Sequence, residues 1–237
     1  FPPCLLFIKY SQIGNGSLMA FLKKWHIIKI PKMNGCLDMQ RQKQEIKQRI
    51  LTAAVEEFHQ KGYRHASMRE IAQKSGMTVG NIYLYFLNKQ ELFTAVVQPV
   101  LEGVEHLITQ MPTPGQSPAE LLKEIADALA ELYMENRLQF ITLMDGSAGS
   151  PYEDAKGRIS LAVCGRIRYE QEMFPPYFRG NTVLFQALGA SLMEGVVYIL
   201  RQDGGDIAKL KETLNRFLAF LFSNLFSQPP AKPSETE

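Results

Sequence analysis

The side chains that perform catalysis or bind metals are present in this chain, but not at the spacings that such sites need. The three cysteines, Cys4, Cys36 and Cys164, lie far apart, whereas zinc sites and disulfide frameworks use closely spaced sets. The four histidines also lack metal-ligand spacing. The sequence has no phosphate-binding GxxxxGKS/T, nucleophile GxSxG or zinc HExxH motif. We therefore expect no catalytic residue, metal or cofactor, and unpaired cysteines typical of a cytoplasmic protein.

The polar side chains between residues 67 and 89 favour a different chemistry, which is contact with nucleic acid. The Asn81 amide can bond bidentately to adenine, while hydroxyls and the Lys89 amine can bind phosphate oxygens. Residues 39–90 carry nine Lys/Arg and four Asp/Glu, whereas residues 91–237 carry twelve and nineteen. A basic segment joined to an acidic body is expected if only that segment meets a polyanion. Charge alone does not distinguish this from a solvated helix face.

The elements that would position these side chains are helices, and the expected fold class is all-α. A first helix is predicted over about residues 40–61, because apolar residues such as Ile46, Ile50 and Phe58 recur at multiples of four. Gly62 then provides a common C-terminal stop. The basic residues of this helix could reach phosphate, but a solubilising face is the favoured interpretation; they are Arg41, Lys43, Lys47 and Arg49.

The next segment has the S-x-x-E pattern of a capping box. Ser67 is expected to accept a hydrogen bond from the backbone N–H of Glu70, whose side chain reaches back. This cap opens a short helix over Met68–Ser75. Gly76 then begins a three-residue turn, and Thr78 caps a third helix.

This third helix is predicted to have one buried and one bare face. The buried stripe is Val79, Ile82, Tyr83 and Phe86, and the exposed side holds Gly80, Asn81, Leu84 and Tyr85. A fourth helix begins after Asn88 and continues to about Gln110. Two short helices joined by a three-residue turn form a helix-turn-helix, whose second helix enters the major groove of DNA.

The stretch Ile50–Leu92 resembles the DNA-binding domain of the TetR family of repressors. The resemblance is carried by Ala54, Phe58, Gly62, Tyr63, Ser67, Ile71, Ala72, Gly76, Met77, Gly80, Tyr83, Phe86, Lys89 and Leu92. Tyr83-Leu-Tyr-Phe86 followed by Asn88-Lys89 is its most specific part. The resemblance implies a homodimer whose C-terminal domain binds a small molecule that releases the DNA. It also implies backbone contacts from Tyr83, Tyr85 and Lys89.

The predicted DNA-binding residues combine base and phosphate contacts. They are Ser67, Thr78, Val79, Gly80, Asn81, Tyr83, Leu84, Tyr85 and Lys89. Asn81 and Leu84 are assigned to base edges, Leu84 through a thymine methyl, and the hydroxyls and Lys89 to phosphates. Tyr83 has a second interpretation as a core residue with a solvated hydroxyl, and the two roles are compatible.

The body is expected to be a helical ligand-binding and dimerisation domain over residues 91–228. Its later helices are predicted at about 117–137, 152–173, 180–202 and 206–227, with a loop over Asp145–Pro151. The last two helices are too apolar for a monomer surface, so a two-fold four-helix bundle is favoured over burial in one subunit. The expected interface residues are Leu188, Leu192, Val196, Leu214, Phe217 and Leu221.

The ligand site is predicted more weakly, because aromatic residues at helical spacing commonly belong to the core. The candidates are His106, Phe140, Met144, Phe174, Tyr177, Phe178 and Tyr198, with Tyr133 as a further polar group. A pocket rich in aromatic and methionine side chains would take an apolar or weakly polar effector.

The ends of the chain are expected to lie outside this organisation. Residues 1–38 are predicted to be an extension or start-site artefact before a natural start at Met33 or Met39, and residues 229–237 a disordered tail. The domains are then a DNA-binding domain at 39–90 and the body at 91–228. The function predicted is a cytoplasmic transcriptional repressor that binds a palindromic operator as a homodimer, without a membrane role. The alternatives are a DNA-bound structural or division factor without ligand release, and an enzyme in the helical body.

Overall fold

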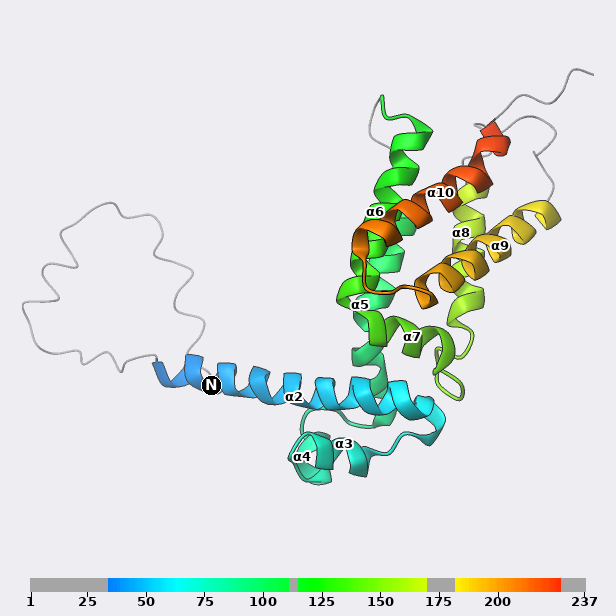
Figure 1. The fold of residues 1–237 in the computed structure, drawn as a ribbon. Coiled ribbons are helices and arrows are strands. Elements are labelled where there is room, and N and C mark those ends of the chain that lie inside the picture. The colour runs from blue at the N-terminus through cyan, green and yellow to red at the C-terminus, as the bar shows by residue number, and fades with distance from the viewer. Residues whose placement is uncertain (1–33, 111–114, 170–181, 227–237) are drawn as a thin grey trace, which may run out of the picture. The chain divides into compact units, whose positions relative to one another are not determined.

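The computed structural model describes residues 34–110, 115–169 and 182–226, which form helices and turns without a β-strand (Figure 1). The all-α prediction is therefore confirmed for this part of the chain. The chain divides into two units, Phe1–Glu45 and Ile46–Glu237. Predictions for residues 1–33 and 229–237 lie outside the described residues.

Helix α2 runs from Asn34 to His65, so its first turn begins six residues before the predicted start. In the first unit, the described part of α2 carries an exposed ion pair between Arg41 Nε and Glu45 Oε1 at 3.0 Å. An exposed pair four residues apart stabilises a helix only slightly, by about 0.3–0.5 kcal/mol. These residues are therefore a solvated helix segment.

The regular part of α2 ends where predicted, because Gly62 has φ 67° and ψ 168°, outside the helical region. The Cβ of an L-residue disfavours this positive φ, and glycine has none. The backbone of Gly62 also meets Gly146, since a Cβ added at Gly62 would lie 3.3 Å from Gly146 O. The next residue, Tyr63, donates its backbone N–H to the same oxygen at 2.7 Å.

Helices α3 (Met68–Lys74) and α4 (Val79–Tyr83) follow, each opened by a hydroxyl cap. Thr78 Oγ1 accepts from Asn81 N at 3.3 Å, as a cap at this position should. The turn between the helices contains Gly76 at φ 68°. The predicted short helix, turn and third helix are thus present.

Helix α5 (Lys89–Thr109) is capped by Asn88, whose Oδ1 accepts from Glu91 N at 2.8 Å. Its first turns pack against α2 through three aromatic rings. The Phe93 ring lies edge-on to Phe58 at 4.9 Å and to Tyr63 at 5.0 Å between centroids. Edge-to-face packing of this kind is favourable, and it anchors α5 to the helix-turn-helix.

The body contains α6 (Pro118–Glu135), α7 (Arg137–Asp145), α8 (Ala155–Tyr169), α9 (Thr182–Arg201) and α10 (Ile207–Phe226). Figure 1 shows α6 beside α10 and α8 beside α9, the pairs that make the most extensive contacts. Helix α6 begins with a complete capping box, in which Ser117 and Glu120 cap one another's backbone N–H.

Helix α7 was not predicted. The residues buried in it are Phe140, Thr142 and Leu143, which do not form a single stripe of period 3.6, so the periodicity test misses the helix. Its last residue, Asp145, directly precedes Gly146. Helix α7 thus leads into the turn that contacts Tyr63.

Helix α9 is long and apolar enough, by length and composition, to cross a membrane. Six residues of α9 are buried against the rest of the body, including Phe185, Met193 and Leu200. Only 28% of its apolar 18-residue window is buried, so packing within the described residues covers part of this apolar surface and leaves the rest outward.

Candidate nucleic-acid interface

Helix α4 has one face in the core and one face in solvent. Ile82 is fully buried and Phe86, just beyond the helix, is 2% exposed. Thr78, Gly80 and Asn81 are exposed. The first face fixes the helix to α2 and α3, so its opposite side is free to enter a groove.

The two tyrosines differ from the prediction. Tyr83, assigned to the buried stripe, is 45% exposed, and Tyr85, assigned to the bare face, is half-buried against the core. Helix α4 ends at Tyr83, and the chain tightens into three-residue hydrogen bonds such as Tyr85 N to Ile82 O at 2.9 Å. A three-residue turn rotates side chains differently from an α-helix, so the 3.6 period does not extend to Tyr85.

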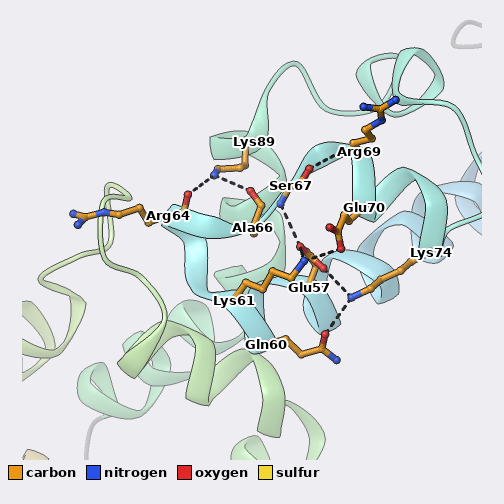
Figure 2. Close-up of polar contacts among 10 residues, drawn as sticks. All are labelled: Glu57, Gln60, Lys61, Arg64, Ala66, Ser67, Arg69, Glu70, Lys74 and Lys89. Atoms are coloured by element: carbon orange, nitrogen blue, oxygen red, sulfur yellow. Dashed lines mark hydrogen bonds and ion pairs between the residues drawn. The ribbon is translucent and has the colours of Figure 1, made fainter.

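A buried charge cluster joins α2 to α3 (Figure 2). The Glu57 side chain is fully buried, and its two oxygens lie 3.0 Å from Lys61 Nζ and 2.8 Å from Lys74 Nζ. Glu57 also accepts from Ser67 N at 3.3 Å. Burial alone would raise the pKa of Glu57, but the hydrogen bonds from Lys74, Lys61 and Ser67 outweigh it and hold the pKa below its ordinary value. Glu57 is thus a charged link between α2 and the start of α3.

This cluster replaces the predicted capping box. Ser67 caps α3, but its hydroxyl accepts from Arg69 N at 3.2 Å and not from Glu70 N. The Glu70 carboxylate does not reach back to the backbone, because it pairs with Lys61 at 2.7 Å. The backbone N–H that it should have satisfied instead donates to Glu57. The capping box does not form because Lys61 binds the Glu70 carboxylate and the buried Glu57 accepts the Ser67 N–H.

Lys89 lies against the end of α2 and not in open solvent. Its Nζ donates to Arg64 O at 3.3 Å and Ala66 O at 3.1 Å (Figure 2) and lies 4.7 Å from the Tyr63 ring centroid. Partial burial lowers the pKa of the Lys89 amine. An ammonium has three N–H donors, so one remains for a further acceptor.

Two of the basic residues on α2 have structural partners. Arg49 donates to Ser75 O at 2.7 Å, and a Cβ added at the neighbouring Gly76 would lie 3.1 Å from the same guanidinium. Lys47 Nζ lies 5.7 Å from the Phe86 ring centroid. The Arg49 contact holds α2 against the α3–α4 turn and the Lys47 contact holds it against the segment after α4, so neither side chain is simply part of a solubilising face.

The geometry agrees with what sequence comparison finds. Residues 50–96 match the family model described as bacterial regulatory proteins of the tetR family. The HTH-type transcriptional regulator AcrR of Shigella flexneri is 36% identical over 84 residues, 35% of this chain and 39% of AcrR. The uncharacterized HTH-type transcriptional regulator YuxN of Bacillus subtilis is 28% identical over 105 residues, 44% of this chain and 36% of YuxN. Residues 50–96 therefore form a DNA-binding domain of the TetR family.

The fold of most of the chain resembles solved structures. MexZ, a key repressor responsible for antibiotic resistance in Pseudomonas aeruginosa, superposes with a TM-score of 0.56 at 20% identity, over 78% of this chain and 97% of MexZ. At this identity the likeness shows the fold alone. The matches in sequence span less than half the length of the two curated relatives.

In the body of the chain, Phe140 and Met144 lie together in a narrow slot between α6, α7 and α9. The slot is closed in this structure and has no interior space for a water molecule, whereas ligand pockets measure roughly 300–1,000 Å³. Tyr133 lines it, and the Tyr133 hydroxyl is buried without a hydrogen-bond partner among the described residues. Burial raises the pKa of this hydroxyl. An Asp145–Arg201 ion pair lies at the rim.

The other predicted ligand residues are not brought into this slot. His106 is exposed on α5, and Tyr198 is 65% exposed on α9, so the described residues enclose neither side chain in a cavity. Phe174, Tyr177 and Phe178 lie outside the described residues. Tyr133, Val197 and Leu200 complete the slot, and periodicity alone could not have separated these residues from ordinary core.

Several predicted dimer residues face the core of their own subunit. Leu214 is fully buried and Val196 is 7% exposed; Leu214 therefore cannot contact a partner, and its assignment to the interface is wrong. The Phe217 ring lies directly on Gly195, leaving no room for a Cβ there. Leu188, Leu192 and Leu221 are only half-buried. The outward residues of α9 are a different and partly polar set: Thr182, Val183, Gln186, Ala187, Ala190, Ser191, Glu194, Tyr198 and Arg201.

Proposed function

We propose that this chain is a dimeric repressor that binds operator DNA through α4 and releases it when a small, largely apolar effector enters the body. The single observation that carries the DNA-binding part is the two-faced α4. Ile82 and Phe86 are buried in the core on one face, while Asn81 and Tyr83 lie in solvent on the other. With five residues, α4 is about 7.5 Å long at 1.5 Å per residue, and fits within a major groove about 12 Å wide.

The proposed contacts follow from which groups remain available. Asn81 is assigned to a base edge, and the Thr78 and Tyr83 hydroxyls and Lys89 to phosphates. Lys89 would bind phosphate with its remaining N–H while its other two hold α2. Tyr85 is assigned a mainly structural role because it packs against the core.

The proposed dimer uses the outward face of α9 described above. Val183 is 74% and Tyr198 65% exposed, and the small Ala187 and Ala190 lie between them. Small side chains allow two helices to approach closely, and large apolar ones at the ends supply burial. A two-fold pairing of this face would place two copies of α4 on one DNA face, which predicts a palindromic operator.

The proposed effector site is the slot beside α7. Because its volume is below that of a drug-sized ligand, an effector would have to move α7 or α9 and separate Asp145 from Arg201. Helix α7 ends at Asp145, and the carbonyl of the next residue, Gly146, accepts a hydrogen bond from the Tyr63 N–H. Tyr63 in turn lies under the Lys89 amine. A shift of α7 would therefore displace the end of α2, directly before α3.

The experiment that tests DNA binding is selection from a random pool, followed by titration of alanine variants on the selected duplex. Asn81→Ala should weaken binding by about 1–3 kcal/mol per half-site, and Tyr83→Ala should also weaken it. His59→Ala, at an exposed position on α2, is the matched control. Affinity should fall steeply with salt. A folded chain that selects no duplex at low ionic strength would refute the proposal.

The dimer and effector are tested separately. Tyr198→Glu should give monomers by sedimentation, whereas Leu161→Glu on α8, where Leu161 is 61% exposed, should leave the dimer intact. A thermal-shift screen should find compounds that stabilise the chain and weaken operator binding. Compounds that stabilise it without affecting DNA would favour a DNA-bound factor that is not released.

A further inference from the structure

Two leucines beside α4 are exposed to an unusual degree. Leu84 is 78% and Leu87 79% exposed, the highest values among the large apolar side chains in the described ranges. Their neighbours Ile82 and Phe86 are buried, so neither leucine is needed to anchor the helix. Isolated exposed leucines are common on protein surfaces, but neighbouring ones suggest a contact surface.

The backbone under both leucines is fixed. Leu84 is the C-cap of α4, and its N–H donates to Asn81 O at 3.2 Å. The Leu87 N–H donates to Glu91 Oε2 at 2.6 Å, and Glu91 is itself held by the Asn88 cap. The two side chains are thus presented from a rigid turn. Little conformational freedom remains to be lost when a partner covers them.

The surrounding charge indicates which partner fits. The carboxylates of Glu57 and Glu70 are both bound by lysines of the same domain, while residues 46–90 carry seven Lys/Arg against three Asp/Glu. The Lys47 amine lies over Phe86, between the two leucines in sequence. The segment that carries this apolar pair is net positive, although the Glu91 carboxylate lies at the Leu87 N–H, and it suits a polyanion that also offers apolar groups. The major groove does so through the C5-methyl group of thymine.

We propose that Leu84 and Leu87 contact thymine methyl groups, so that part of the operator's sequence is read through methyl burial and not through hydrogen bonds. This inference rests on the proposed DNA-binding function and specifies the chemistry of its operator. Each half-site would then contain at least one thymine whose methyl group, and not its hydrogen-bonding edge, contributes to affinity.

The test replaces thymine by deoxyuridine, which removes only the methyl group and keeps the base pair. The full chain is titrated on its selected operator with each symmetric thymine pair replaced in turn. Burial of one methyl is worth about fourfold in affinity, so loss from both half-sites should cost about 15-fold. In Leu84→Ala or Leu87→Ala protein, the replacement at the contacted pair should cost almost nothing further, because the partner side chain is gone.

Leu138→Ala, at a 37% exposed position on α7, is the control and should show the full wild-type loss. The inference is overturned if no deoxyuridine pair weakens binding, or if the loss is equally large in both leucine variants. It is also overturned if these variants keep operator affinity but lose binding to another protein or to anionic vesicles. Absence of any DNA binding by the folded chain would instead refute the proposed function, so the two failures are distinguishable.

Discussion

The contact between Gly62 and Gly146 predicts that alanine at Gly62 lowers the stability of the chain more than alanine at glycines without such a contact. Gly62 has φ +67°, and an added Cβ would lie 3.3 Å from Gly146 O. A left-handed φ costs an L-residue about 1–2 kcal/mol, and crowding in a packed region adds roughly 1–3 kcal/mol. Gly62→Ala should therefore destabilise the chain by about 2–5 kcal/mol. For a chain of this size that is a loss of roughly 4–20 °C in Tm, at about 2–4 °C per kcal/mol.

Three other glycines separate the two contributions. Gly205 has φ +89° with nothing within 4 Å, so Gly205→Ala measures the backbone cost alone. Gly146 lacks a positive φ, but its added Cβ would lie 3.0 Å from Thr142 O, so Gly146→Ala measures crowding alone. Gly204 has neither feature, and alanine there should be neutral or slightly stabilising. Denaturant melts of all four variants give the comparison. A Gly62→Ala protein as stable as Gly204→Ala would refute the reasoning.

The other predictions concern charges and caps. The folded-state pKa of Glu57 is lowered, so its contribution to the free energy of unfolding is full above pH 4.5 and disappears as pH falls through the lowered pKa. In urea melts at pH 2–7, Glu57→Gln should therefore reduce the loss of stability toward acid pH. Ser117→Ala should cost about 1 kcal/mol through loss of the α6 cap, measured by the same melts at pH 7. Tyr133→Phe removes a buried hydroxyl without a partner, so stability should stay equal or rise by up to about 1–3 kcal/mol. A marked loss would mean that the hydroxyl is satisfied.

Local signals predicted the helix-turn-helix because its caps and stops depend on a few neighbouring residues. Gly62 adopts the positive φ expected of a stop, and Thr78 and Asn88 cap the helices that follow them. Each of these roles depends on the backbone within about four residues, so single-sequence chemistry captures it.

The errors arise where distant groups compete or a helix ends early. Glu70 satisfies the capping-box pattern, but its carboxylate pairs with Lys61, which lies on α2. Glu57 and Lys74 are 17 residues apart and meet only after α2 and α3 pack, so no local pattern could pair them. Tyr83 and Tyr85 exchange roles because α4 ends at residue 83.

The body was harder because apolar periodicity does not say what covers a stripe. Leu214 lies on an apolar face of α10, as expected, but that face packs inside the subunit. Outward positions such as Ala190 are small and weakly apolar, so they do not stand out in a sequence. Burial in the subunit and burial by a partner produce the same pattern of residues.

If the effector acts through α7, the coupling must also be reciprocal. The slot residues Phe140 and Met144 lie six and two residues before Gly146, and the Gly146 carbonyl accepts a hydrogen bond from the Tyr63 N–H. An effector that weakens operator binding by some factor must bind the DNA-bound chain more weakly by the same factor. Crowding introduced by Gly146→Ala acts at this contact and at neither ligand. Gly146→Ala should therefore change the coupling factor by a larger ratio than it changes the affinity for effector alone or for operator alone. If the coupling factor is unchanged, the coupling between slot and DNA does not pass through Gly146 and would run along α5 instead.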